Sequence, residues 1–287
     1  MITLSRPSAE IHVPDGTAID AALARTTHLA IGAHQDDVEI MAADGILQAF
    51  ERPDRWFTAV VVTDGAGSPR SGAYGGYSDA MMREVRRDEQ KKAAGLGEYT
   101  AAILLDHPTV VLKDPARREV VDDLTAILRA TRPEIVYAHN LADKHDTHVA
   151  LALRTIAALR ALPERERPAR VFGCEVWRDL DWLPDEEKVA FDLSARPHLQ
   201  AALVAVFDSQ IEGGKRYDLA TVGRRRAHAT FATSHGVDTA ASAGYAMDLT
   251  PLVVDPSLDP AAFVAGAVDR FKADVVARVE RLTGART

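Results

Sequence analysis

The sequence predicts an α/β fold, a Rossmann-like and mostly parallel sheet with helices on both faces. Short runs such as FTAVVVT at 57–63 are rich in β-branched residues and carry no charge, which is typical of strands buried on both sides in a parallel sheet. Segments with helical spacing separate each such run from the next, and this alternation indicates repeated βα units. With 287 residues, of which 47% are hydrophobic, the chain can form a sizeable core.

The elements follow a regular order as far as residue 177. An extended arm with two short β-like runs, ITL and EIHV, occupies residues 1–16, and TAIDAALA predicts a short helix after it. Apolar runs predict the strands of the sheet, at 28–33, 57–63, 101–106, 134–139 and 170–177. Amphipathic or capped segments predict the helices between them, at 38–50, 80–97, 118–132 and 147–162.

The last hundred residues are less regular. Helices are expected at 198–210 and 259–282, on either side of a loop-rich part, and no linker divides the chain. We therefore expect a single domain, residues 1–287. Within it, an N-terminal arm (1–25) and a C-terminal extension (178–287) flank the Rossmann-like core (28–177).

Composition argues against several classes of protein. A formal charge of −8 disfavours a nucleic-acid-binding surface, and no apolar run is long enough for a transmembrane helix. The first residues do not resemble a secretion signal, so we expect a cytoplasmic protein. Cys174 is the only cysteine, which excludes an internal disulfide and a multi-cysteine zinc site. A bound metal would need histidine and carboxylate ligands.

Two histidine-acid clusters fall at equivalent places in the predicted sheet. His34 and Asp37 follow the first core strand, and His145 and His148 follow the fourth. The carboxyl ends of parallel strands form the ligand crevice, so the two clusters can face one another there. Two imidazoles and one carboxylate suit a catalytic Zn²⁺ with an open position. The alternative is structural: an acid at a helix start caps the helix, and His-x-x-His can be a polar surface.

Several motifs together resemble the zinc-dependent PIG-L/LmbE-like deacetylases, which act on N-acetylglucosamine-containing compounds. The first is His34-Gln35-Asp36-Asp37-Val38-Glu39 followed by Gly45, and the second is His145-Asp146-Thr147-His148. Weaker matches follow the chain in the same order as in the family: Thr63-Asp64-Gly65, Arg86 with Glu89, and Ser209-Gln210. The resemblance covers roughly residues 28–210 and implies a Rossmann-like fold.

The resemblance also implies roles for the residues of the two main motifs. His34, Asp37 and His148 would be the metal ligands, for Zn²⁺ or alternatively Fe²⁺ or Co²⁺. Asp36 would be the general base for the attacking water, because a metal lowers the pKa of water towards about 7. His145 would stabilise the oxyanion or protonate the leaving amine.

One departure from the family pattern concerns His145. Thr147 stands where the family has the aspartate that orients this histidine, so Asp146 or Asp143 would have to replace that aspartate.

Substrate contacts are expected from three further residues. Arg86 would reach the substrate by analogy with the family arginine, although a solvated position on a charged helix is the alternative. Asp106 and His107 end the third core strand, so they too are expected to face the crevice. The Gly/Ser/Tyr-rich segment 64–79 is long enough to form a wall or lid over a sugar.

We interpret the chain as a zinc-dependent hydrolase that removes an N-acetyl group from an amino-sugar-containing small molecule. Two alternatives remain open: an amidase that cleaves a larger acyl group, and a catalytically weak sugar-binding protein that retains the metal. A nucleotide-binding Rossmann protein is disfavoured, because no G-x-G-x-x-G follows the first core strand. Neither nucleic acid nor membrane is an expected partner. A homo-oligomer could form through the β-edge of the N-terminal arm.

Overall fold

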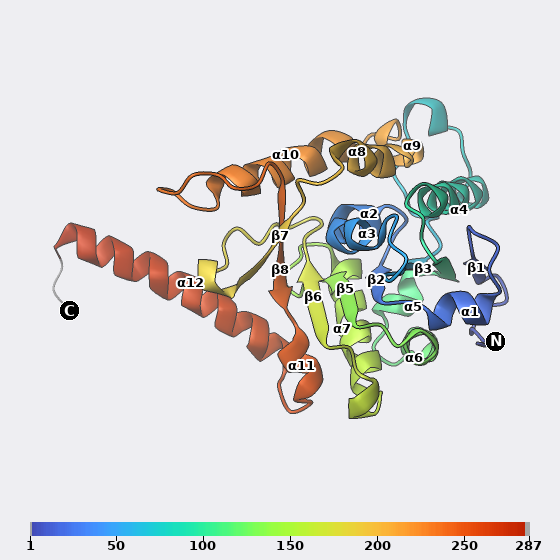
Figure 1. Cartoon of the computed structure of the whole chain (residues 1–287), viewed down its shortest axis with the longest axis horizontal. Helices are drawn as coiled ribbons and strands as arrows, with labels where there is room; N and C mark the ends of the chain where they lie inside the picture. The colour runs from blue at the N-terminus through green and yellow to red at the C-terminus, as the bar shows by residue number, and fades with distance from the viewer. Residues whose placement is uncertain (1, 285–287) are drawn as a thin grey trace.

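A computed structural model describes residues 2–284 and confirms the α/β class. One eight-stranded sheet runs through the molecule in the order β1-β4-β3-β2-β5-β6-β8-β7 (Figure 1). Its strands are β1 (Glu10–His12), β2 (His28–Gly32), β3 (Phe57–Thr63), β4 (Ala101–His107), β5 (Ile135–His139), β6 (Arg170–Cys174), β7 (Lys188–Asp192) and β8 (Ala243–Asp248). The N-terminal arm supplies β1 and the C-terminal extension supplies β7 and β8, so all three segments share one sheet.

The five central strands, β4-β3-β2-β5-β6, are parallel, whereas β1, β7 and β8 pair antiparallel at the two sides. From β2 the chain first winds outward to β3 and β4, and then returns to β5 on the other side of β2. The loops after β2 and β5 therefore diverge at the carboxyl edge. In open α/β sheets this switch point is where the ligand crevice lies.

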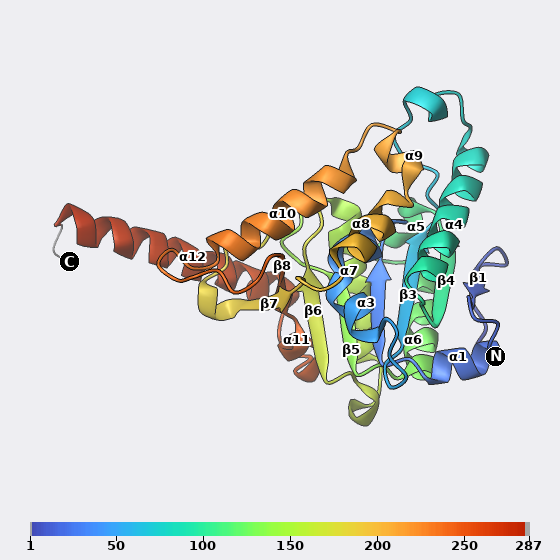
Figure 2. The ribbon, with the colours of Figure 1, turned by 45° about the horizontal axis from the view of Figure 1, so that its top comes forward.

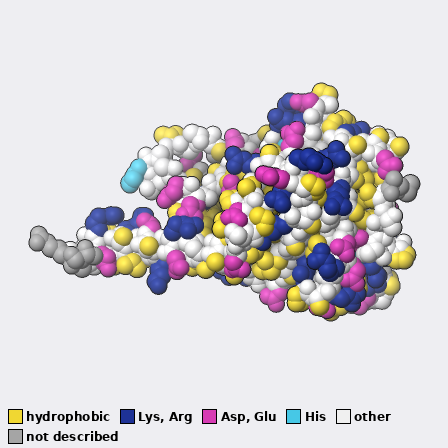
Figure 3. Space-filling model, turned by 90° about the horizontal axis from the view of Figure 1, so that it is seen from below, with side chains coloured by type: hydrophobic (Ala, Val, Ile, Leu, Met, Phe, Trp, Pro, Cys, Tyr) yellow, Lys and Arg dark blue, Asp and Glu magenta, His cyan; other side chains and the backbone are white. Residues whose placement is uncertain are grey.

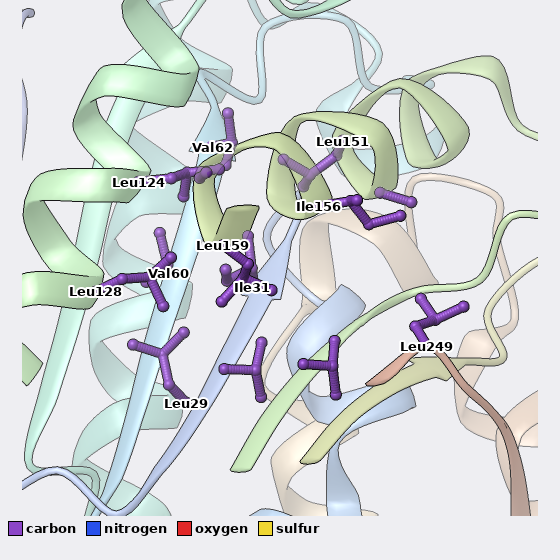
Figure 4. Packing of buried hydrophobic residues seen from close by; sticks show 14 of the residues in the cluster. Leu29, Ile31, Val60, Val62, Leu124, Leu128, Leu151, Ile156, Leu159 and Leu249 are labelled. Atoms are coloured by element: carbon purple, nitrogen blue, oxygen red, sulfur yellow. The ribbon is translucent and has the colours of Figure 1, made fainter. Parts of the chain in front are cut away.

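Side chains that alternate along each central strand build two separate cores. Leu29, Ile31, Val60 and Val62 pack on one face, where Figure 4 shows them against leucines of the covering helices. Their neighbours Ala30, Ala59, Val61, Ala102 and Leu104 face the opposite side. This is the two-residue period of a strand buried on both faces.

Helices cover both faces of the sheet (Figure 2). The first core includes side chains of α1 (Ile19–Ala24), α5 (Thr109–Lys113), α6 (Glu119–Thr131), α7 (Asp146–Arg160), α11 (Thr250–Val254) and the first turns of α12 (Pro260–Thr283). The second includes side chains of α2 (Asp37–Met41), α3 (Ala43–Ala49), α4 (Asp79–Leu96) and α8 (Pro197–Ala205). The short α9 (Asp208–Ile211) and α10 (Tyr217–Phe231) continue along this second side. Among the residues described, no helix has the length and apolarity needed to cross a membrane.

The structure differs from the sequence prediction in several elements. The helix expected over 38–50 is two helices, because Ala42 leaves the helical region at φ −110° and ψ 26°. The run ITL at the start of the chain forms no strand. The loop-rich part in fact contains α10, β8 and α11, and β7 lies ahead of it in the same extension. Its strands lie towards the edge of the sheet and mix polar with apolar residues, so they lack the continuous apolar run of the central strands.

Two helical glycines provide a test of the packing around α3. A Cβ at Gly45 would lie 2.5 Å from Cε2 of the buried Tyr137, whereas a Cβ at the exposed Gly95 of α4 meets nothing within 4 Å. We expect Gly45→Ala to lower the free energy of unfolding by about 1–3 kcal/mol through overpacking. Gly95→Ala should raise it by about 0.5–1 kcal/mol through helix propensity. Urea titrations would measure the free energy of unfolding of both variants. Equal effects of the two substitutions would contradict the close contact between Gly45 and Tyr137.

Candidate active site

The loops after β2 and β5 bring the two histidine-acid clusters together. His34 and Asp37 lie at the start of α2, and His148 lies in the first turn of α7. Nδ1 of His34 is 3.2 Å from Oδ2 of Asp37 and 3.3 Å from Nε2 of His148, and this Nε2 is 3.4 Å from the same carboxylate oxygen. Three potential metal-ligand atoms from two distant segments thus converge on one point.

The hydrogen bonds around His148 fit a bound cation. Oδ2 of Asp143 lies 3.2 Å from Nδ1 of His148, so this carboxylate accepts the imidazole proton. Nε2 of His148 faces the carboxylate of Asp37 at 3.4 Å, and although burial would lower the pKa of His148, Asp37 and Asp143 together raise it. The two buried carboxylates therefore favour positive charge at this point, which a bound cation would also supply. The donor set, two imidazoles and one carboxylate, suits Zn²⁺ with an open position.

A third histidine lies behind the cluster. The ring of His139, at the end of β5, stacks on His148 with centroids 3.9 Å apart. Its Nε2 accepts the backbone N–H of Ala33 at 3.0 Å and lies 3.4 Å from Oδ2 of Asp37. Because His139 is fully buried and joins β5 to the end of β2, it fixes the two ligand-bearing loops relative to each other.

Asp143, not Asp146, contacts the cluster. Besides His148, it accepts the backbone N–H of His145 at 3.0 Å and that of Trp177 at 3.2 Å. Asp146 is exposed at the first turn of α7. Nδ1 of His145 accepts the backbone N–H of Thr147 at 3.2 Å. The backbone of Thr147 therefore orients His145, and it leaves the hydrogen of the neutral imidazole on Nε2.

Asp36 is held in an unusual backbone conformation beside the ligands. Its φ of 102° is rarely adopted by residues other than glycine, and its side chain is buried. The buried guanidinium of Arg86 lies 3.4 Å from Oδ2 of Asp36 and also donates to the carbonyl of Gln35 and to Oγ of Ser68. Arg86 thus ties the loop after β2 to the loop after β3. These contacts stabilise the strained position of Asp36.

Burial and neighbouring charges shift the pKa values of the site in opposite directions. Burial raises the pKa of Asp36 well above its usual range, and Arg86 only partly opposes this. Burial would raise the pKa of Asp37 too, but His148, His139 and His34 together hold it well below its usual value. Burial, with His148 and His34 nearby, lowers the pKa of His145 to about 4. The imidazole of His145 is therefore neutral at pH 7.

A cavity of about 520 Å³ opens over the cluster. His34, Asp36, Asp37 and His145 line its base, and Arg86 borders it. From the segment 64–79, only residues at its start line the cavity: Gly65, Gly67, Ser68 and Pro69. The remaining lining side chains include Thr109, Lys113, Val176, Trp177, Gln210, Lys215 and Tyr217. The opening is thus bordered by both aromatic and cationic groups.

The structure places Asp106 and His107 away from this cavity, outside its lining. Asp106 has a φ of 57°, accepts Oγ–H of Ser8 at 2.5 Å and lies 3.4 Å from a guanidinium nitrogen of Arg87. His107 is buried, with Nε2 2.9 Å from Oδ2 of Asp123 in α6. Both side chains hold the N-terminal arm or α6 against the sheet, so we leave them out of the proposed substrate site.

Other cavity residues carried no clear signal in the sequence. Thr109 and Lys113 belong to α5, a five-residue helix without a recognisable period. Lys215 and Tyr217 lie at the start of α10 in the part expected to be loop-rich. His139 could have been noticed, because a histidine that ends an apolar strand stands next to the crevice.

The comparisons with known proteins agree with this geometry. Residues 29–159 match the model of the PIG-L family, described as GlcNAc-PI de-N-acetylase. The core of the chain carries the PIG-L signature. This match runs from β2 into α7, so it contains the complete candidate metal cluster, and it confirms the resemblance found in the sequence. A search of curated proteins finds no match.

Solved structures share the fold at low sequence identity. N,N'-diacetylchitobiose deacetylase from Pyrococcus horikoshii is 18% identical, with a TM-score of 0.59 over 77% of this chain and 82% of that one. The conserved protein TT1542 from Thermus thermophilus is 22% identical, with a TM-score of 0.59 over 82% and 99%. The 4-carboxy-2-hydroxymuconate hydratase GalB from Pseudomonas putida is 18% identical, with a TM-score of 0.59 over 78% and 96%. These similarities establish a common fold, which the PIG-L-like core shares with proteins of different named activities.

Asp143 and Asp146 offer a matched test of which carboxylate orients His148 for metal binding. We expect Asp143→Asn to weaken Zn²⁺ binding by about 10- to 100-fold, because the imidazole of His148 loses the carboxylate that orients it. Asp146→Asn should leave the affinity within about twofold, since this side chain is exposed. Competition with a chromogenic chelator would measure both constants. A larger loss of Zn²⁺ affinity in Asp146→Asn than in Asp143→Asn would show that Asp146, not Asp143, supports the metal site.

Proposed function

We propose that the protein is a metal-dependent N-deacetylase of an amino-sugar-containing small molecule. One observation carries the proposal: His34, Asp37 and the buried His148 converge beneath a cavity that His34, Asp36, Asp37 and His145 line. A hydrolytic site needs a metal position, a base and a hydrogen-bond donor around one space, and these residues can supply all three. The PIG-L family match adds the expectation of de-N-acetylation.

Each residue has a role that follows from its contacts. A Zn²⁺ ion held by His34, Asp37 and His148 would acidify water and polarise the acyl oxygen of the substrate. Asp36 accepts a proton from the attacking water, and Arg86 keeps its carboxylate in place. His145, neutral and protonated on Nε2, donates a hydrogen bond to the developing oxyanion. The balance of the reaction is amide plus water to acetate plus amine.

The outer part of the cavity supports a sugar as the substrate. The indole of Trp177 lines the opening and lies near the ring of His145, with centroids 6.0 Å apart. Lys215 lies over the same indole, 4.9 Å from its centroid, and Tyr217 meets it edge-on at 6.1 Å. An aromatic face beside hydrogen-bond donors is a common arrangement for a ring that carries hydroxyl groups.

The decisive experiment measures acetate release from N-acetylglucosamine and from its glycosides. We expect turnover that is lost after chelator treatment and restored by Zn²⁺. Asp36→Asn should lower kcat by about 10²- to 10⁴-fold, since a general base contributes about this much. The Asp36→Asn protein should still bind Zn²⁺, whereas His34→Ala should lose both the metal and activity.

The other outcomes separate the alternatives. Release of a longer acid, but not acetate, from N-acylated sugars would indicate an amidase that cleaves a larger acyl group. Bound Zn²⁺ and bound sugar without turnover would indicate a binding protein. A wild-type protein that binds no divalent metal would overturn the proposal.

Trp177 tests the sugar subsite separately from the chemistry. We expect Trp177→Ala to raise KM by about 2- to 10-fold, the equivalent of about 0.5–1.5 kcal/mol for a lost aromatic contact. Trp177→Phe should recover most of this loss. Steady-state kinetics on one acetylated sugar would show the effect in KM. A change confined to kcat would instead indicate that the indole of Trp177 positions His145.

A further inference from the structure

The last helix of the protein extends beyond the body of the molecule. Phe263 and Val264 at the start of α12 pack on the core, and Ala267 is buried. The ring of Phe271 meets that of Trp182 at 6.2 Å. From Val268 to the end of α12 every residue except Glu280 is exposed. Figures 1 and 2 show this part of α12 projecting away from the sheet and its covering helices.

The projecting part carries an apolar stripe. Its members recur every three or four residues, which places them on one side of the helix: Val268, Phe271, Val275, Val279 and Leu282. Their exposed fractions range from 38% for Phe271 to 78% for Leu282. Figure 3 shows hydrophobic side chains along this projection, interspersed with both kinds of charge. A continuous exposed stripe of this kind marks an interaction surface.

The projecting part of α12 is too short to form a stable helix by itself. Residues 272–283 span only about 18 Å, and isolated helices of such length are marginal in water. Val275, Val276 and Val279 are β-branched and lower the helix propensity further. Packing on the stripe would provide the missing stabilisation.

We propose that the stripe of α12 pairs with the same stripe of a second copy of this chain, in antiparallel orientation. The flanking charges are self-complementary in that arrangement. Asp274 and Arg278, which form an ion pair at 3.0 Å, flank one side of the stripe. When the partner helix runs in reverse about a centre near residue 276, Asp274 meets Arg278 of the partner subunit.

The attachment of α12 to the body selects the antiparallel order. The rest of the molecule packs beside α12 as far as Phe271. Two parallel α12 helices at the usual distance of about 8–10 Å between their axes would therefore bring the two molecules into collision. An antiparallel neighbour leaves the two bodies at opposite ends. The mixed charges also disfavour a lipid surface, which selects a strongly basic polar face.

Paired substitutions on opposite sides of α12 test the proposal in the full-length protein. Val275→Glu with Val279→Glu places two charges in the stripe, and Ala273→Glu with Ala277→Glu places the same charges on the exposed opposite side. Analytical ultracentrifugation should give the mass of two chains for the wild type and the control. The stripe variant should dissociate, with a dissociation constant raised at least ~100-fold. A single-chain mass for the wild type, or an unaltered dimer of the stripe variant, would overturn the proposal.

Cross-linking tests the orientation and does not depend on charged variants. Cys174 is buried and is the only natural cysteine, so an introduced thiol is the only accessible one. Val275→Cys lies close to the two-fold axis and should cross-link to its own copy with a short thiol-reactive reagent. Val268→Cys would lie about 24 Å along the axis from its copy and should not. Equal cross-linking at both positions would refute the antiparallel order, and none at Val275→Cys would refute the pairing.

Discussion

The site depends on one buried carboxylate oxygen. Oδ2 of Asp37 accepts the backbone N–H of His34 at 2.7 Å and has imidazole nitrogens of His34, His139 and His148 within 3.4 Å. These groups come from the loop after β2, the end of β5 and the start of α7. A carboxylate in this position requires compensating positive charge, because an unpaired buried charge costs several kcal/mol. The same requirement for positive charge makes this oxygen the centre of the proposed metal site.

The rest of the site rigidifies the groups around that oxygen. Arg86 connects the loop of Asp36 with Ser68, and Asp143 connects His148 with the backbone of Trp177. Both are buried charged groups whose cost of desolvation is offset by several hydrogen bonds each. In the proposed reaction these contacts would pre-organise the base and the metal ligands, and hydrolytic enzymes gain much of their rate from such pre-organisation.

The parts of the protein with a clear hydrophobic pattern could be predicted from the sequence. Strands β2 to β6 are apolar on both faces, and the resemblance to the family motifs singled out the five residues brought together at or beneath the cavity: His34, Asp36, Asp37, His145 and His148. The same strand-end rule led to Asp106 and His107, which the structure places elsewhere. Strand position does not determine which way a side chain turns, and the positive φ of Asp106 redirects the chain. α5 and the start of α10 contribute to the cavity through tertiary packing of short, irregular segments, for which a sequence period gives no indication.

The second motif shows how a backbone group can replace a side chain. In the related pattern an aspartate orients the catalytic histidine, and here Thr147 occupies that place. The N–H of Thr147 donates to Nδ1 of His145, whereas an aspartate would accept a proton from it. An aspartate partner favours a protonated imidazole, whereas the amide selects the neutral form with its hydrogen on Nε2. Combined with the lowered pKa of His145, this arrangement suits a hydrogen-bond donor to an oxyanion better than a proton donor to the leaving amine. In the proposed reaction the departing amine would then obtain its proton from another group, and Asp36, having accepted one from water, would return it.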